Sequence, residues 1–306
     1  MLRAYGPQKN LRRSTLDIIQ GINQIVEEKD GYTLTVRQLH YQFVSKGWLP
    51  NTAQTYNAIQ GAAKTGRMAG LISWTAIEDR GRSLRGLEAW ETPAEALKEQ
   101  VYKYRIDMWA NQPWRPEIWV EKKALEGVVG RIATELEVDY YAQSGYDSAS
   151  QSWRAGQRLA RYIQKGQRPI IFHLGDHDPS GVHMTDDNRS RLTTFCGVPV
   201  MVVRLALTMD QVEELSPPPN FAKESDSRKP YYDEYMHSIG HEDLCASSWE
   251  LDALEPEYIH GLVREAVERI RDPDLWDAQL EQQVEDRRLL AEMMALLGGG
   301  GSDDDE

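Results

Sequence analysis

The sequence predicts an α/β protein with a smaller helical module at its N-terminus, and two observations carry this prediction. Residues 115–206 alternate short apolar strands with helices, which is typical of a mainly parallel sheet covered by helices. Residues 1–85 instead repeat apolar residues at helical spacing between turn signals. We therefore expect a connection at 86–114, a C-terminal extension of the sheet domain at 207–297, and a disordered Gly-rich acidic tail at 298–306.

The N-terminal module is predicted to contain three helices and a short strand. Apolar residues at helical spacing indicate the first helix, namely Leu16, Ile19, Ile22 and Ile25. A second helix is expected from near Thr35 to Gly47, and a third from 50–52 to near Gly70. Residues 71–74 then have the composition of a strand. Helix, turn, helix and strand in this order are the layout of a winged helix, a common DNA-binding module.

The sheet domain is predicted from four apolar runs separated by helical segments. The expected strands are 117–120, 139–142, 169–174 and 198–206. The expected helices of this part are 122–137, 149–165 and one that begins after Pro179. Thr92-Pro93 opens a helix in the connection, and 273–297 is predicted to be a long polar helix.

The charge of the chain is unevenly distributed. The 306 residues carry a net charge of −13, but residues 1–85 hold 12 Lys/Arg against 6 Asp/Glu, and residues 86–306 hold 23 against 42. A basic module on an acidic body can hold a phosphate backbone locally. Five basic residues of the module are candidates for DNA-phosphate contacts: Lys64, Arg67, Arg80, Arg82 and Arg85.

Cysteine usage and hydropathy indicate a cytoplasmic protein. Cys196 and Cys245 lie far apart without a CxxC motif, so neither a zinc ribbon nor a disulfide framework is indicated. The N-terminal residues lack the apolar stretch of a signal peptide. No apolar run approaches the ~20 residues that a membrane span requires.

The strongest chemical signal follows the predicted strand 169–174. In the extended segment Gly175–Gly181, Asp176 and Asp178 point to one side and His177 to the other. The carboxyl end of a parallel strand is where open α/β sheets bind ligands. Two carboxylates on one side therefore indicate a site for Mg²⁺, a cation that prefers oxygen ligands.

A further carboxylate, Glu121, closes the first predicted strand in the segment WVEKKAL. One glutamate after the first strand and an aspartate pair in GDHDPSG after a later strand resemble the pattern of a Toprim domain. This resemblance implies that Glu121, Asp176 and Asp178 hold Mg²⁺, or Mn²⁺ in its place, near a reacting phosphodiester. The competing interpretation is a zinc or metallophosphoesterase site in which histidines, His173 and His177, join Asp176 and Asp178, with His183 on the next helix. Packing roles are favoured for them, because His173 lies within the strand and His177 faces away from the aspartates.

Tyr41 is the candidate nucleophile. Four residues of its predicted helix share an apolar face: Val36, Leu39, Phe43 and Val44. Tyr41 lies about 130° from the centre of that face, so its hydroxyl is expected to face solvent. Arg37 lies one helical turn earlier, where its charge could bind a phosphate and favour the tyrosinate.

This segment resembles the active-tyrosine helix of the type IIB topoisomerase A subunits, the family of topoisomerase VI A and the meiotic double-strand-break proteins. Their pattern is an arginine followed by an aromatic pair whose second member is the catalytic tyrosine, and Arg37 and Tyr41 match those positions. The resemblance covers about 30–206 and continues more weakly to 256. His40 replaces the first aromatic, Ser180 replaces the usual tyrosine after the aspartates, and the chain is short like the compact Mini-A members.

The resemblance implies magnesium-dependent DNA cleavage and rejoining through a 5′-phosphotyrosyl intermediate. It also implies a homodimer on double-stranded DNA in which each tyrosine meets the metal site of the other protomer. The sequence contains no P-loop, so an ATP-driven step would require a separate ATPase subunit. Three other interpretations stay open: a Toprim nuclease that uses water, a Toprim primase, and a non-catalytic DNA-binding regulator.

Overall fold

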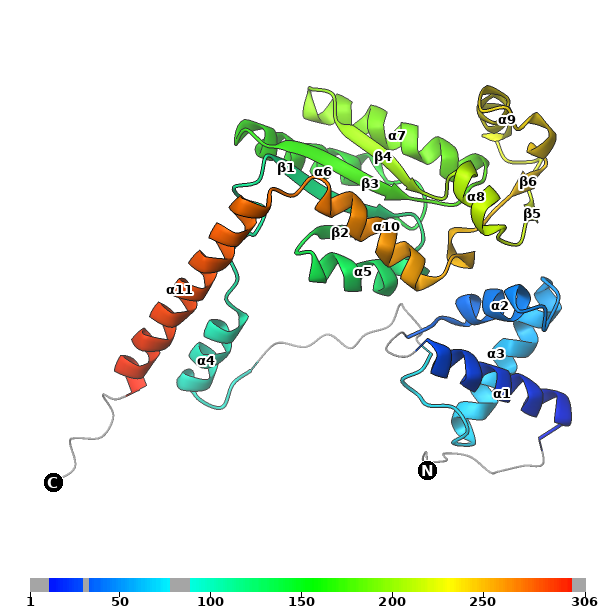
Figure 1. Cartoon of the computed structure of the whole chain (residues 1–306), viewed down its shortest axis with the longest axis horizontal. Helices are drawn as coiled ribbons and strands as arrows, with labels where there is room; N and C mark the ends of the chain where they lie inside the picture. The colour runs from blue at the N-terminus through cyan, green and yellow to red at the C-terminus, as the bar shows by residue number, and fades with distance from the viewer. Residues whose placement is uncertain (1–10, 30–32, 78–88, 299–306) are drawn as a thin grey trace.

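A computed structural model describes residues 11–29, 33–77 and 89–298 of the chain. These residues form a three-helix N-terminal unit and a larger body built on a parallel sheet, which we call the sheet body (Figure 1). Three of the basic residues predicted to contact DNA, Arg80, Arg82 and Arg85, lie outside the described residues.

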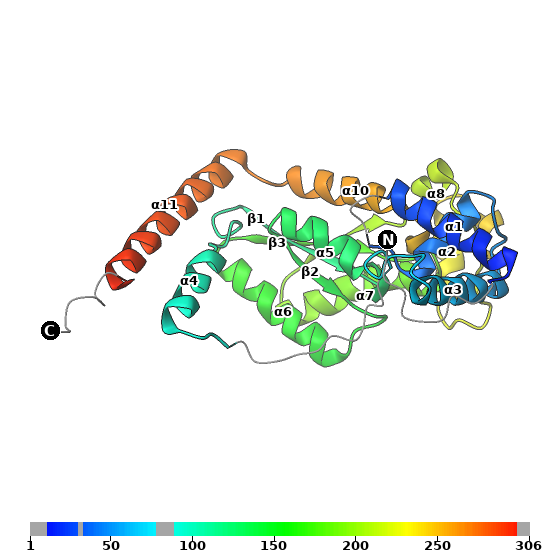
Figure 2. The same ribbon diagram turned by 90° about the horizontal axis from the view of Figure 1, so that it is seen from below.

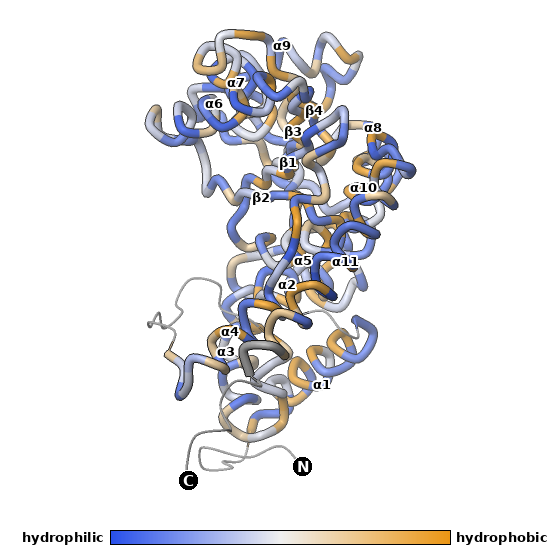
Figure 3. Tube along the Cα trace, turned by 90° about the vertical axis from the view of Figure 1, so that its left-hand side faces the viewer, coloured by the Kyte–Doolittle hydropathy of each residue, from blue (hydrophilic) through white to orange (hydrophobic). Residues whose placement is uncertain are grey.

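The N-terminal unit consists of α1 (Arg13–Glu28), α2 (Val36–Ser45) and α3 (Ala53–Met68), as the helical spacing predicts. Thr35 and Thr52 each cap the helix that follows with a capping box, which satisfies backbone N–H groups that the first turn leaves without partners. The three helices share an apolar core of their own, which includes Ile22, Leu39 and Ile59. Orange and blue bands alternate along α1 in Figure 3, as expected for a helix with one face in such a core.

The predicted strand at 71–74 is absent, and this prediction was wrong. After α3 the chain folds back on the helix end, where the Gly66 carbonyl accepts hydrogen bonds from the backbone N–H groups of Leu71 and Ile72. Gly70 adopts a φ of +70°, a conformation that suits glycine, and so allows this reversal. The only β-contact near the expected wing is a bridge between Leu34 and Ile77 within the described residues, so the winged helix is not confirmed.

The sheet body confirms an α/β fold with a parallel sheet. Four strands, β1 (Trp114–Val120), β2 (Asp139–Ala142), β3 (Arg168–Leu174) and β4 (Met201–Ala206), are arranged in the order β2-β1-β3-β4 with all pairs parallel. Val120 pairs with Leu174, so the carboxyl ends of β1 and β3 lie side by side. The acidic residues that follow these two strands are therefore brought to one edge of the sheet.

Helices cover both faces of the sheet. The covering helices are α5 (Glu126–Glu135), α6 (Ala149–Gln164), α7 (Pro179–Cys196) and α10 (Pro256–Glu268). Two others, α8 (Met209–Leu215) and α9 (Lys229–Ser238), follow β4, and α9 packs against α7. The larger core includes apolar residues of α5 and α10, and the smaller core on the other side includes residues of α6 and α7. Two short strands, β5 (Asn220–Phe221) and β6 (Ser247–Ser248), pair antiparallel beside this body.

Two helices, α4 (Pro93–Lys103) and α11 (Pro273–Gly298), extend away from the body at the end opposite the N-terminal unit (Figures 1 and 2). Both were predicted from the sequence. The two helices contact each other, and Tyr104, the residue after α4, donates a 2.6 Å hydrogen bond from its hydroxyl to Asp286 of α11. Among the described helices, none combines the length and apolar character needed to cross a membrane.

Candidate metal centre and tyrosine site

The loop that follows β3 is folded tightly around the side chain of Glu121. A Cβ atom added at Gly181 would collide with the backbone of Asp176, so glycine is required there, and it would lie 2.8 Å from Glu121 Oε2. A Cβ atom at Gly175 would lie 2.9 Å from the same Glu121 oxygen. The same oxygen accepts a 2.9 Å hydrogen bond from the backbone N–H of Asp176. Glu121 therefore fixes the loop that presents Asp176.

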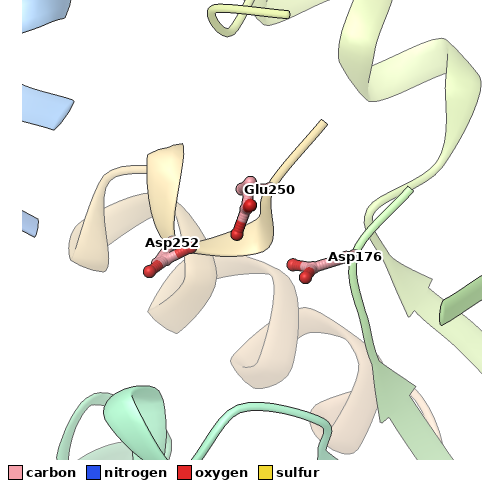
Figure 4. A group of neighbouring side chains, drawn as sticks. All are labelled: Asp176, Glu250 and Asp252. Carbon is pink, nitrogen blue, oxygen red and sulfur yellow. The ribbon is translucent and has the colours of Figure 1, made fainter. Parts of the chain in front are cut away.

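Three carboxylates converge beside this loop. Oxygen atoms of Asp176, Glu250 and Asp252 all lie within 4.8 Å of one another, and we call these residues the acidic cluster (Figure 4). Asp176 follows β3, whereas Glu250 and Asp252 lie at the start of the short 3-10 helix η3 (Leu251–Ala253). Oxygen ligands at this spacing are suited to a divalent cation.

Backbone hydrogen bonds hold the two segments of the acidic cluster together. His177 and Trp249 exchange two of them, with N–O distances of 2.8 and 2.9 Å. The N–H of Leu251 donates to Asp176 Oδ1 at 2.7 Å. The cluster is therefore held by the fold of the main chain as well as by side-chain contacts.

Two cationic side chains contact the acidic cluster. Lys122 Nζ lies 2.8 Å from Asp176 Oδ1 and 2.7 Å from Asp252 Oδ1, and it also pairs with Glu250. Arg37 reaches the cluster from α2, with Nη2 2.7 Å from Glu250 and Nε 3.1 Å from Asp252. Three carboxyl groups thus meet two cationic side chains. A divalent cation held by the same oxygens would take the place of the Lys122 ammonium.

Burial dominates the electrostatics of the acidic cluster. It raises the pKa of Asp176, although the ammonium of Lys122 acts in the opposite direction. Burial also acts to lower the pKa of Lys122, but the carboxylates of Asp176, Asp252 and Glu250 raise it well above its usual value. Lys122 therefore stays charged, and the buried carboxylates depend on a nearby cation.

The three acids predicted to bind metal, Glu121, Asp176 and Asp178, lie close together in the structure but have different contacts. Only Asp176 belongs to the acidic cluster. Asp178 caps α7, with its Oδ1 accepting a 2.7 Å hydrogen bond from the N–H of Gly181. The sequence prediction did not include Glu250 and Asp252. Their one-residue separation is the same as that of Asp176 and Asp178, and this spacing was the available signal.

The histidines have packing neighbours rather than carboxylate partners. His173 Nδ1 lies 2.8 Å from Thr185 Oγ1, and His183 Nδ1 lies 2.8 Å from the Tyr146 hydroxyl. His177 lies against the rings of Tyr232 and Trp249. Burial lowers the pKa of both His173 and His177 to about 3, so both are neutral at pH 7. Within the described residues, the group of metal-ligating side chains contains no histidine.

Tyr41 is buried, with 5% of its surface exposed, so the expectation of a solvent-facing hydroxyl was wrong. The apolar spacing along α2 identifies only the residues that pack into the core of the N-terminal unit. α2 also packs against η3 of the sheet body, whose carboxylates Glu250 and Asp252 lie close to Tyr41. Arg37 is its hydrogen-bonding neighbour.

The ionisation of Tyr41 also differs from expectation. Burial, followed by the carboxylates of Glu250 and Asp252, raises the pKa of Tyr41, and Arg37 only partly offsets these effects. In this arrangement the phenol is therefore the favoured form. Arg37 does lower the pKa of Tyr41, as expected from its charge, but not enough to outweigh the effects that raise it.

A cavity of about 750 Å³ lies between the two units. It is lined from the N-terminal unit by Arg37, Tyr41 and Tyr56, and from the sheet body by residues that include Asp178 and Glu250. One chain thus brings the tyrosine and the acidic residues to a common space. The resemblance implies instead that the tyrosine meets the metal site of another protomer.

A second cavity of about 600 Å³ adjoins the first and shares Arg37 and Tyr56 with it. Two residues predicted to contact DNA, Lys64 and Arg67, line this second cavity. Lys64 is exposed. Arg67 also has a local role, because its guanidinium donates to the Ile77 carbonyl.

Comparison of the chain with known proteins gives no family assignment. No protein-family model, curated protein or solved structure matches it. The geometry of the site is therefore the basis of the functional proposal.

Proposed function

We propose that this protein is a metal-dependent DNA-cleaving enzyme that uses Tyr41 as its nucleophile, similar to the A subunits of type IIB topoisomerases. One observation carries the proposal. Tyr41, Arg37 and the acidic residue Glu250 line a common cavity at the carboxyl edge of a parallel sheet. A hydroxyl, a guanidinium and carboxylates are the groups that phosphodiester transesterification requires.

In the proposed reaction, the Tyr41 hydroxyl oxygen attacks a backbone phosphorus of DNA. A bond forms between this oxygen and phosphorus, and the bond from phosphorus to the 3′ oxygen breaks. The phenolic proton leaves to solvent, and the departing 3′ oxygen takes up a proton to become a hydroxyl. One phosphodiester replaces another, so the reverse reaction rejoins the strand without an additional energy source.

The acidic cluster would hold the metal. Carboxylate oxygens of Asp176, Glu250 and Asp252 suit Mg²⁺ or Mn²⁺, and Glu121 and Asp178 lie near enough to affect the charge of the site. A bound divalent cation would stabilise charge on the reacting phosphodiester and offset the carboxylates that disfavour the tyrosinate. Displacement of Lys122 from the cluster makes its ammonium available to a phosphate.

Arg37 is the residue best placed to position the phosphate. Its side chain is 44% exposed, contacts Tyr41, and pairs with Glu250 and Asp252. Its planar guanidinium can bind two phosphate oxygens at once.

The two cavities support a path for double-stranded DNA. They meet at Arg37 and Tyr56, and Lys64 lies along the second cavity. A homodimer would place one such site on each strand, and strand passage would require a separate ATPase subunit.

A Toprim-type nuclease is the second candidate, and the burial of Tyr41 favours it. A buried tyrosine with a raised pKa is a poor nucleophile until its surroundings change. In this alternative a water molecule would attack the phosphodiester, and Tyr41 would be dispensable for cutting.

Cleavage of supercoiled plasmid tests the metal requirement of the proposed function. We expect cleavage in Mg²⁺, none in EDTA, and at least about a 10³-fold loss in Asp176→Ala, because the metal stabilises reacting charge by several kcal/mol. Asp210→Ala, which removes an exposed carboxylate on α8, is the matched control and should cut normally. Undiminished cutting in EDTA would reject the metal site.

A further inference from the structure

The β5–β6 pair presents an aromatic ring at the edge of the first cavity. Phe221 is 92% exposed and lines the cavity that contains Tyr41. In Figure 1, β5 and β6 lie on the side of the sheet body that faces α2 and α3. The ring thus projects at the junction of the two units.

The backbone around Phe221 is held in place by hydrogen bonds. Its backbone pairs with β6, and the next residue, Ala222, is buried and donates its backbone N–H to the Ala246 carbonyl, just before β6, at 2.8 Å. The preceding residue, Asn220, accepts a 3.1 Å hydrogen bond from Asn51 of the N-terminal unit. Both neighbours of Phe221 are therefore held in place while its ring contributes almost nothing to packing.

The surroundings of Phe221 indicate the chemistry of a ligand. Most of the cavity lining is polar, and the exposed cation Lys223 lies two residues after Phe221. A protein partner would require a wider apolar surface than one ring provides. A nucleotide fits better, because its base has a flat apolar face and its phosphate pairs with a cation.

We propose that Phe221 stacks on a DNA base next to the phosphate that Tyr41 attacks, and so unstacks the duplex at the cleavage position. This inference rests on the proposed function. Its physical basis is that an apolar side chain can enter a base step and kink the duplex. The distorted backbone would then be able to enter the cavity between the two units.

A duplex whose bases are already partly unstacked should bind more tightly, because the unstacking cost of a few kcal/mol per step is reduced. The test uses two fluorescently labelled 30-base-pair duplexes that are identical except for a central two-base mismatch. Their affinities for the full chain are measured by anisotropy in EDTA, so that no cleavage is needed. We expect wild type to prefer the mismatched duplex by about tenfold, in the range of a base–aromatic stacking contact.

Phe221→Ala should bind both duplexes with nearly equal affinity, and Phe221→Trp should restore the preference. The matched control is Tyr102→Ala, which removes an 86% exposed ring on α4 that lines neither cavity, and it should behave as wild type. An unchanged preference in Phe221→Ala would overturn the inference. So would a change in oligomeric state alone, because Phe221 would then belong to a protein interface.

The binding test of Phe221 can fail or succeed independently of the cleavage test of Tyr41. A Phe221-dependent preference without any covalent protein–DNA link in Mg²⁺ would reject cleavage by Tyr41 and leave the stacking role in place. A covalent link without the preference would support the proposed function and reject the stacking role.

Discussion

The N-terminal unit and the sheet body are each held together by an apolar core, whereas the junction between them has many polar contacts. Each has a separate apolar core: one includes Ile22 and Leu39, and the other includes Ile118 and Val263. The junction is instead made of polar and ionic contacts, which are expected to be sensitive to salt and to bound ions.

Several contacts make up this junction. Lys29 pairs with Glu255 at 2.5 Å and with Glu257 at 3.1 Å, and Gln42 donates to Glu255 at 2.8 Å. Arg37 pairs with two members of the acidic cluster. The candidate site therefore lies at a junction with several polar and ionic contacts. The charged side chains at this junction can change their ion-pairing partners more readily than the apolar side chains of either core can move.

The arrangement of both halves of the site in one chain can be tested by mixing mutants. Tyr41→Phe and Asp176→Ala chains, co-expressed and co-purified as a mixed dimer, should give no nicks in plasmid DNA, because every site then carries one defect. Both variants must still bind DNA for the test to be valid. Nicks from a verified mixed dimer would show that the tyrosine of one protomer works with the acids of the other, as the family resemblance implies.

Removing Lys122 should expose the dependence of the acidic cluster on a cation. Lys122→Met is expected to lower the free energy of unfolding in EDTA by about 3–5 kcal/mol, because it leaves the buried carboxyl group of Asp176 without a cation, whereas Glu250 and Asp252 keep Arg37. Mn²⁺ should stabilise this variant more than wild type, since the metal no longer competes with the ammonium. Thermal unfolding with and without Mn²⁺ measures both effects.

Lys123→Met is the matched control for that experiment, because Lys123 is the next residue and is exposed. It should leave the stability and the response to Mn²⁺ unchanged. Equal stabilisation of wild type and Lys122→Met by Mn²⁺ would mean that the metal and Lys122 do not share a position.

The fold was largely predictable because its signals are local. The capping threonines Thr35 and Thr52 and the apolar run of β3 mark their elements within a few residues. The site was predicted only in part because it is assembled from distant segments. Glu250 follows a two-residue strand and comes 74 positions after Asp176, so no apolar run signals that it belongs to the same site. The burial of Tyr41 depends on contacts with the sheet body that a helical wheel cannot include.

The basic side of the N-terminal unit should contribute the smallest effect. Lys64→Glu is expected to weaken DNA binding severalfold for all sequences and to reduce the slope of log affinity against log salt by about 1. Arg67 is left intact because it also holds the chain after α3. Lys165→Glu, an exposed residue just after α6 that lines neither cavity, serves as control. An unchanged affinity in Lys64→Glu would mean that DNA does not follow the second cavity.

The central claim is that Tyr41 becomes covalently linked to DNA at the junction of the two units. The most direct measurement is to stop a reaction in Mg²⁺ with denaturant, digest the trapped protein, and identify the residue that carries the nucleotide by mass spectrometry. We predict a 5′-phosphotyrosyl adduct on Tyr41 in wild type and no adduct in Tyr41→Phe. Cut DNA without any adduct, or an adduct on another residue, would contradict the account.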